Sequence, residues 1–261
     1  SQLRVGPVTC ITPPEAAIDR TPRILAILGQ PKPQQGRFYL GDKNGHGQDS
    51  RRSKEQSGYT DGNRIRGPKV YPHHALGIQH TAMTSEQSNQ NRTVLESVKE
   101  GTQFEFDLHV TNLSAVELGA LLWLLSLKEE HNLRLGLGKP LGFGSVYAEI
   151  RWEDTALADG AKWIEAIADW DSRVESLTEQ QREDIKSEFT QAINSANPDL
   201  LNSFLRVCCG FGALPIHYPP SQSANAENGN HFEWFVNNEK GVDHFSLPDL
   251  TAQDVSLPRN S

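Results

Sequence analysis

The sequence predicts an α+β fold, because a strand, a capped helix, a glycine-rich segment and a second strand follow one another between residues 102 and 152. Residues 102–111 alternate apolar and polar side chains, which is typical of a strand with one buried face. Ser114 precedes an apolar run and Glu117 follows it by three positions, so we expect a capping box and a helix over Ala115–Lys128. This order of elements corresponds to half of a ferredoxin-like βαββαβ unit.

The composition indicates a globular body with long polar loops. The 261 residues are 36% hydrophobic, with 21 glycines, 15 prolines and a mean hydropathy of −0.54. The longest apolar run, Leu118–Leu127, is half of the roughly 20 residues that span a bilayer, so we expect no membrane segment. Three cysteines without a zinc-binding spacing, and no signal-peptide pattern, favour a cytoplasmic protein. The chain does not begin with Met, so we expect either the middle of a longer polypeptide or a chain whose beginning has been removed.

Charge divides the chain into two predicted parts, residues 1–150 and residues 151–261. The net charge is −8, but the second part holds 18 acidic and 8 basic side chains, whereas the first holds 15 and 17. A basic surface in the first part favours contact with phosphate groups, which the second part would repel. We therefore expect the second part to be an acidic, mainly helical extension that contacts proteins. Its expected helices lie at Trp163–Trp170, after Thr178 with Gln181 at the box position, and from Asn197 to Gly210.

A polar insert at residues 41–67 interrupts the first part. Residues 32–70 hold 9 basic and 4 acidic side chains. The insert has few apolar residues to bury, so we expect a long loop or partial disorder, extended as a flap that orders on a partner. Its arginines, and a lysine that follows it, are candidates for phosphate contact: Arg51, Arg52, Arg64, Arg66 and Lys69.

The segment Leu135–Val146 is rich in glycine and lies between the predicted helix and the second strand. Its glycines permit positive φ angles and let a ligand backbone approach, while nearby cations supply positive charge. It fits neither the Walker A pattern nor G-x-G-x-x-G, because Pro140 and Leu141 occupy positions that those motifs reserve for other residues. A tight turn between strands, without any ligand, is the other interpretation. The candidate residues are Arg134, Gly136, Gly138, Lys139, Gly142 and Gly144.

Three consecutive stretches, FEFDLHVTNLS, AVELGALLWLLSL and LGLGKPLGFGSV, together resemble the C-terminal half of the RAMP superfamily. These proteins build the RNA-binding backbone of type III CRISPR effector complexes. The earlier stretch IRGPKVYPHH is similar to one that precedes this half in some members. The resemblance covers residues 64–150, and residues 1–31 do not supply the strand and helix that begin a whole module.

The resemblance implies a ferredoxin-like, RRM-related module with a long polar insertion. It implies that Gly136, Gly138, Lys139, Gly142 and Gly144 contact guide RNA (crRNA), and that the insert faces RNA. Target RNA and other RAMP modules of the same effector complex are the implied partners. No cofactor motif is recognisable.

Two alternatives remain open at the level of the sequence. In the first, the chain is an aspartate-dependent, metal-assisted endoribonuclease that cuts target RNA. Asp42, Asp49 and Asp61 in the insert would then be the candidates, and Mg²⁺ the expected metal; no residue is assigned as catalytic. In the second, the chain is a ferredoxin-like protein-interaction module that binds no RNA. The adjacent His73 and His74 favour RNA contact or surface exposure over metal binding.

Overall fold

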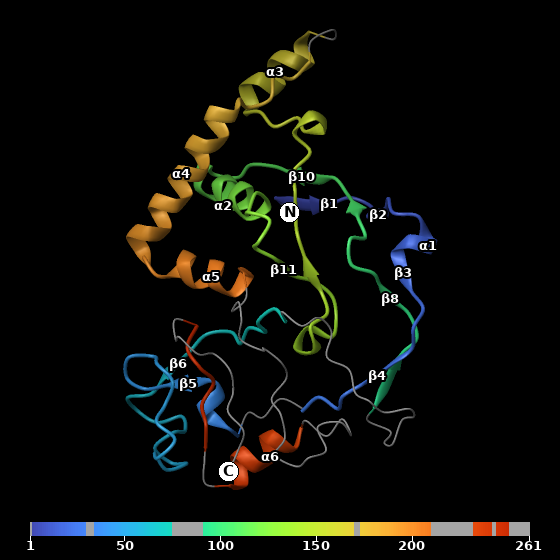
Figure 1. The fold of residues 1–261 in the computed structure, drawn as a ribbon. Coiled ribbons are helices and arrows are strands. Elements are labelled where there is room, and N and C mark those ends of the chain that lie inside the picture. The colour runs from blue at the N-terminus through green and yellow to red at the C-terminus, as the bar shows by residue number, and fades with distance from the viewer. Residues whose placement is uncertain are drawn as a thin grey trace. The chain divides into compact units, whose positions relative to one another are not determined.

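The computed structural model describes residues 2–29, 34–74, 91–169, 173–209, 232–241 and 244–250 (Figure 1). The chain forms two compact units, and each is assembled from three separate stretches of sequence. The first unit comprises Ser1–Val8, Phe106–Leu133 and Val146–Leu205. The second comprises Thr9–Glu105, Arg134–Ser145 and Arg206–Ser261.

The first unit combines a short strand pair with helices. Strand β1 (Leu3–Val5) pairs antiparallel with β10 (Leu108–Val110), so that Leu3 lies opposite Val110 and Val5 opposite Leu108. The helices of this unit are α2 (Ala115–Leu125), α3 (Gly160–Ala168), α4 (Glu179–Ala196) and the beginning of α5 (Leu200–Cys209).

Helix α2 begins at the capping box that the sequence predicts. The Ser114 hydroxyl accepts a hydrogen bond from the Glu117 amide at 3.3 Å, and the Glu117 carboxylate accepts from the Ser114 amide at 2.8 Å. These bonds hold the pKa of Glu117 below its ordinary value. The helix ends at Leu125, three residues before the predicted end. Thr178 and Gln181 form the second predicted capping box, at the start of α4.

Helices α2 and α4 lie side by side and form the packed centre of the first unit (Figure 1). A Cβ atom on Gly119 of α2 would lie 2.3 Å from the Ile185 carbonyl oxygen of α4, so the two backbones approach closely because Gly119 has no side chain. The Trp123 ring lies 5.7 Å, between centroids, from each of the Phe189 and Phe204 rings. Aromatic packing of this kind stabilises the pair beyond simple burial of area.

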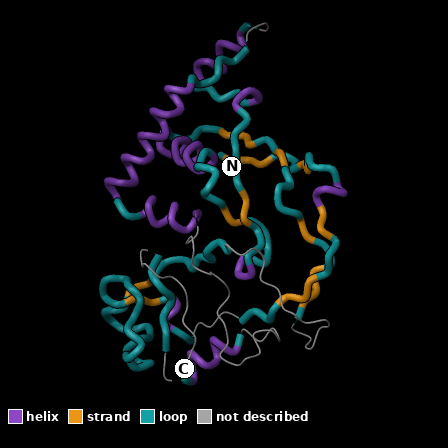
Figure 2. Tube along the Cα trace, viewed as in Figure 1, coloured by secondary structure: helices purple, strands orange, loops and turns teal. Residues whose placement is uncertain are grey.

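The second unit contains a two-stranded antiparallel ribbon, whose strands alternate with loops along the tube in Figure 2. Helix α1 (Pro14–Ala17) interrupts its first strand run. The ribbon pairs β2 (Thr9–Cys10) with β9 (Phe104–Glu105), β3 (Ile18–Asp19) with β8 (Ser97–Val98), and β4 (Arg23–Leu25) with β7 (Arg92–Val94).

The single half-buried strand predicted over residues 102–111 is therefore two short strands, β9 and β10, with different partners. Pro7 lies between β1 and β2, at the level of the break, and has no N–H to donate to a ladder. Phe104 and Phe106 were expected on a buried face, but they are 49% and 50% exposed. A ribbon of two strands buries much less of either face than a wider sheet does.

The polar insert is organised by its own polar side chains. Strands β5 (Leu40–Gly41) and β6 (Arg64–Ile65) pair antiparallel at its base. The buried Arg37 guanidinium donates to the Asp49 carbonyl oxygen at 2.9 Å and to the Arg52 carbonyl oxygen. The expectation of a loop or partial disorder was thus incomplete, because hydrogen bonds to a charged group replace the missing apolar contacts.

Helix α6 (Glu233–Lys240) packs against the residues that precede β5. Trp234 is completely buried, and the Phe38 ring lies 6.4 Å from it and 5.9 Å from the Phe235 ring. The buried Gln35 donates to the Phe235 carbonyl oxygen at 2.8 Å. Gly36–Phe38 forms a 3-10 turn, and strand β5 begins shortly after it, at Leu40.

The mixed α+β class is confirmed, since the described residues hold helices together with small antiparallel sheets. Each of these sheets has two strands, and the ferredoxin-like arrangement stays a prediction. The domain boundary at residue 150 also stays a prediction. Within the described residues, no helix is both long and apolar enough to cross a membrane.

Candidate nucleic-acid interface

The glycine-rich segment is a fixed loop between β11 (Leu133–Arg134) and β12 (Ser145–Val146). The Leu135 amide donates to the Gly144 carbonyl oxygen at 2.9 Å and closes the loop at its base. A 3-10 turn over Lys139–Leu141 forms its centre. Left-handed glycines flank this turn, with φ of 71° at Gly138 and 92° at Gly142. Such angles are costly for other residues, so the loop requires glycine at both positions.

The space around each glycine shows whether the loop itself excludes a side chain there. A Cβ on Gly144 would lie 1.8 Å from the Leu135 carbonyl oxygen, and one on Gly138 would lie 2.8 Å from the Phe143 ring. The turn interpretation explains these two positions without a ligand. Gly136 also has a positive φ, 78°, but its added Cβ would meet no atom of the described residues within 4 Å. Gly136 is therefore the point where the loop backbone is open to a ligand.

Leu141 anchors the loop in the core of the second unit. Its side chain is 1% exposed and packs with Ala26, Leu25, Phe143 and Phe235. Opposite this anchor the tip of the loop is open, and Leu137 is 93% exposed. Burial of one leucine therefore fixes the position of the exposed backbone that surrounds Gly136.

Arg134 connects the loop to an earlier stretch of the chain. Its guanidinium donates to the Tyr71 carbonyl oxygen at 3.1 Å, to the Pro72 carbonyl oxygen, and to the Phe143 carbonyl oxygen at 2.9 Å. Burial lowers the pKa of Arg134. Arg134 was predicted to contact RNA directly, and that contact stays a prediction. The structure gives it a positioning role, because these three carbonyl oxygens receive most of its N–H groups.

His73 reinforces the same connection. Its Nδ1 atom lies 2.7 Å from the Ser145 hydroxyl oxygen, at the start of β12. The KVYPHH stretch and the glycine loop, which the sequence separates by some sixty residues, are thus joined by side chains from both. The two stretches are therefore in contact within the second unit.

Each of the two stretches contains one of the predicted cations, Lys69 in the first and Lys139 in the second, and their contacts differ. Lys69 lies over the Tyr39 ring, with its Nζ atom 4.7 Å from the ring centroid and 3.4 Å from the Tyr39 hydroxyl. Lys139 begins the 3-10 turn. For the described residues, the structure records no ion pair of Lys139, so its charge remains available to an anion.

The four predicted arginines of the insert have separate environments. Arg51 pairs with Asp49 at 2.5 Å and is largely exposed. Arg52 donates to the Gln56 carbonyl oxygen at 2.8 Å and to Asn63 at 3.1 Å. Arg64 lies exposed on β6. Arg66 pairs with Asp249, near the other end of the sequence. The four therefore do not share one set of partners.

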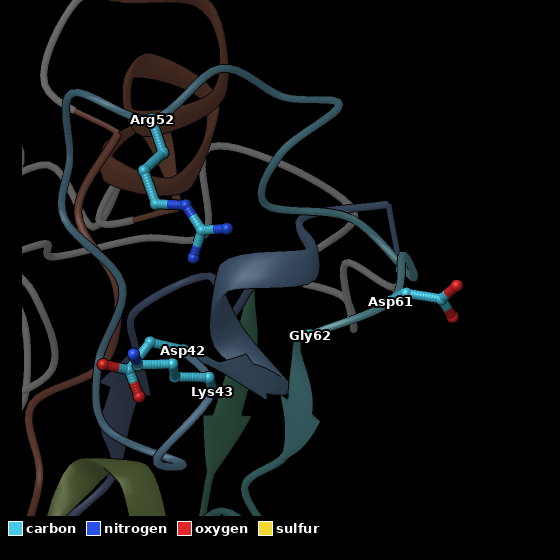
Figure 3. Close-up of a pocket in the computed structure, with 5 residues that line it drawn as sticks. All are labelled: Asp42, Lys43, Arg52, Asp61 and Gly62. Atoms are coloured by element: carbon cyan, nitrogen blue, oxygen red, sulfur yellow. The ribbon is translucent and has the colours of Figure 1, made fainter.

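A hollow of about 400 Å³ lies on the insert and is lined by Asp42, Lys43, Arg52, Asp61 and Gly62 (Figure 3). In Figure 3 the Arg52 guanidinium points into the hollow, whereas the Asp61 carboxylate points away from the other labelled side chains. The wall therefore combines charges of both signs.

The three aspartates proposed for metal-assisted cleavage are not assembled into one site. Amides of Asn44, at 2.8 Å, and His46, at 3.0 Å, donate to the Asp42 carboxylate and lower its pKa. The Arg51 side chain donates to Asp49 and holds its pKa well below the usual range. Within the described ranges, no three His, Cys, Asp or Glu side chains lie so that they could share a metal ion.

No model of a known protein family matches the chain, and no curated protein matches it significantly. The similarity of the three motifs to the RAMP superfamily therefore remains a prediction from the sequence.

Sequence reasoning missed the residues that organise the insert. Arg37 is buried, although its neighbours gave no sign that it would differ from the exposed arginines. Asp249 lies in a Pro/Asn-rich stretch and contacts residues about two hundred positions earlier. Neither helical nor strand periodicity carries information about such a contact, so the amino-acid pattern alone offers no signal for it.

Proposed function

We propose that this chain binds guide RNA as a backbone segment of a type III CRISPR effector complex, with target RNA and other RAMP modules as further partners. The glycine loop and the KVYPHH stretch would form the guide-contact surface. The observation that carries this proposal is the Arg134 connection. It joins the glycine loop to the KVYPHH stretch, and both lie in the region of residues 64–150 that resembles the RAMP superfamily, although they are far apart in the sequence.

The chemistry of the surface supports binding to a nucleic-acid backbone. Residues 135–137 of the loop are exposed, and an added Cβ on Gly136 would meet no atom of the described residues within 4 Å, which permits close approach of a sugar-phosphate backbone. Lys139 and Lys69 supply positive charge on the same unit. Amides and cations of this kind account for most contacts to phosphate, and they do not read sequence. A guide-binding scaffold requires such sequence-independent contacts.

A decisive test adds a side chain at the open position without breaking the loop. Asn tolerates left-handed φ better than other residues with a side chain, so Gly136→Asn should keep the loop conformation. We expect this variant and Lys139→Gln each to lower the affinity for guide RNA about tenfold or more, as expected for loss of a charge-assisted contact. The measurement is fluorescence anisotropy with a labelled repeat-containing guide, using the full natural polypeptide.

Gly101→Asn is the matched control. Gly101 has a φ of 80° and nothing within 4 Å of an added Cβ, but it lies in the turn before β9 and not in the loop. It should bind guide RNA as the unchanged protein does. Equal affinities for Gly136→Asn, Lys139→Gln and Gly101→Asn would overturn the proposed contact. Absence of nucleic acid in the purified complex would favour the protein-interaction module instead.

One observation favours the endoribonuclease as a second candidate. Asp42 lines the same hollow as Arg52 and Lys43, so a carboxylate and cations are present together, whereas the Asp61 carboxylate points away from them. If the chain is the endoribonuclease, Asp42→Ala or Asp61→Ala should slow Mg²⁺-dependent cleavage of guide-paired target RNA, while guide loading stays normal. As a scaffold, the chain should tolerate both changes without any effect on cleavage.

A further inference from the structure

An anion-binding site on the insert is filled by a carboxylate from the same chain. The Asp249 carboxylate accepts a hydrogen bond from the Gly47 amide at 3.1 Å and a second from the Arg66 guanidinium. The His46 Nδ1 atom lies 3.4 Å from the same carboxylate. All three groups belong to the insert, and together they provide the amide, guanidinium and imidazole that commonly hold a phosphate.

The guanidinium of this site is shielded from water. The Arg66 side chain is 11% exposed and that of Asp249 is 29% exposed. Arg66 also donates to the Leu247 carbonyl oxygen at 2.6 Å. A cation that has lost most of its water needs an anion close by, and Asp249 supplies it here. Without Asp249, the site would attract another anion of similar shape.

Besides the two Arg66 contacts, hydrogen bonds between uncharged groups hold the segment that carries Asp249. We call residues 244–250 the strap. Its Phe245 amide donates to Asn238 at 2.7 Å, and the Ser246 hydroxyl donates to the Gln48 carbonyl oxygen at 3.2 Å. A Cβ on Gly47 would lie 2.9 Å from the Ser246 hydroxyl oxygen, so the strap covers Gly47 closely. Asp249 is the strap's one acidic residue.

We propose that Arg66, Gly47 and His46 form a phosphate site for RNA, and that Asp249 occupies it as an intrachain competitor until an RNA phosphate displaces the strap. The identity of the ligand rests on the proposed guide-RNA function. The site itself is separate from the glycine loop, so it adds a second contact point on the insert. RNA binding at this site then requires release of the Asp249 carboxylate.

The test compares Asp249→Asn with the unchanged protein in the full polypeptide, using the labelled guide RNA as probe. Loss of the competing carboxylate should tighten RNA binding about fivefold or more, the range of typical coupling between two ligands. The gain should disappear in the Asp249→Asn, Arg66→Gln double variant, because the freed guanidinium is the group that RNA contacts. Glu96→Gln, which removes the same charge from an exposed pair with Arg20, should leave the affinity unchanged.

Unchanged or weaker RNA binding by Asp249→Asn would show that Asp249 only stabilises the fold. The glycine-loop proposal would survive that result if Lys139→Gln still weakens binding, whereas an unchanged protein that binds no RNA would overturn both. If Asp249→Asn does not fold, hydrogen exchange of the unchanged protein decides the question. Amides of residues 244–250 should then exchange faster when RNA is bound, and unchanged exchange would contradict strap displacement.

Discussion

The residues of the loop fall into two groups: those that its conformation requires, and those that we propose to contact RNA. Gly144, Gly138 and Leu141 are needed by the loop itself, since a side chain is excluded at the first two and buried at the third. Arg134 acts between backbone segments by donating to their carbonyl oxygens. At Gly136 the loop requires a left-handed φ but leaves room for a side chain, and Lys139 has no ion pair within the described residues. Mutations at the two kinds of position should therefore have different consequences.

Gly144→Ala should destabilise the second unit much more than Gly136→Ala. Both residues have left-handed φ, which costs alanine about 1–2 kcal/mol. Only Gly144 also faces the Leu135 carbonyl oxygen, at a distance that forces the loop to open. We expect a loss of about 3 kcal/mol or more for Gly144→Ala and about 1 kcal/mol for Gly136→Ala, by urea unfolding followed by circular dichroism. Equal losses would mean that the loop does not close through Gly144.

At the scale of elements, helix α2 is determined by both local and distant residues. Its beginning depends on Ser114 and Glu117, which are three positions apart. Its packing depends on Gly119, which meets the Ile185 carbonyl oxygen of α4. Glycine inside a helix normally lowers its stability. At position 119 it avoids a clash with the backbone of α4, and this offsets the loss of helix propensity.

Gly119→Ala should lower stability although alanine is the better helix former. The gain in helix propensity is about 1 kcal/mol, and the added Cβ would lie 2.3 Å from backbone of α4. Because backbone cannot move aside like a flexible side chain, we expect a net loss of about 1–3 kcal/mol in thermal or urea unfolding. Gly160→Ala, at the start of α3 with nothing within 4 Å, should instead be neutral or slightly stabilising. A stabilised Gly119→Ala variant would contradict the close approach of the two helices.

The difference between local and distant determinants also explains how much of the structure could be predicted from the sequence. Both capping boxes and the helices that they begin were identified, because the signals are local. The left-handed glycines of the loop were expected for the same reason. The strand over residues 102–111 was wrong as a single element, since its partners lie about one hundred positions earlier and Pro7 breaks their ladder. The Arg66–Asp249 pair was likewise beyond any local pattern.

At the scale of the whole molecule, the acidic balance limits the RNA binding that we propose. The net charge of −8 repels a polyanion, while the positive balance of residues 1–150 attracts it. Binding should therefore depend on a few local cations and respond strongly to salt. The acidic helix α4 belongs to the first unit, and the glycine loop belongs to the second.

The salt dependence of the RNA affinity should report the number of phosphate contacts. Each contact to single-stranded RNA contributes about 0.7 to the slope of log K against log salt concentration. Lys139→Gln should reduce the magnitude of the slope by about 0.7, because one released counterion is lost. Arg20→Gln, which removes an equal charge already paired with Glu96, should leave the slope unchanged. Titrations of labelled guide RNA at several salt concentrations check both values, and identical slopes for the two variants would contradict a phosphate contact at Lys139.

The ribbon of the second unit has a consequence for the order of folding. Leu25 of β4 pairs with Arg92 of β7, and the whole polar insert lies between them in the sequence. The first such contact must close a long loop, which is entropically costly, whereas β3–β8 and β2–β9 can then add with little further closure. The ribbon should zip from Leu25 and Arg92 toward Thr9 and Glu105, and pairing of β4 with β7 should limit its rate.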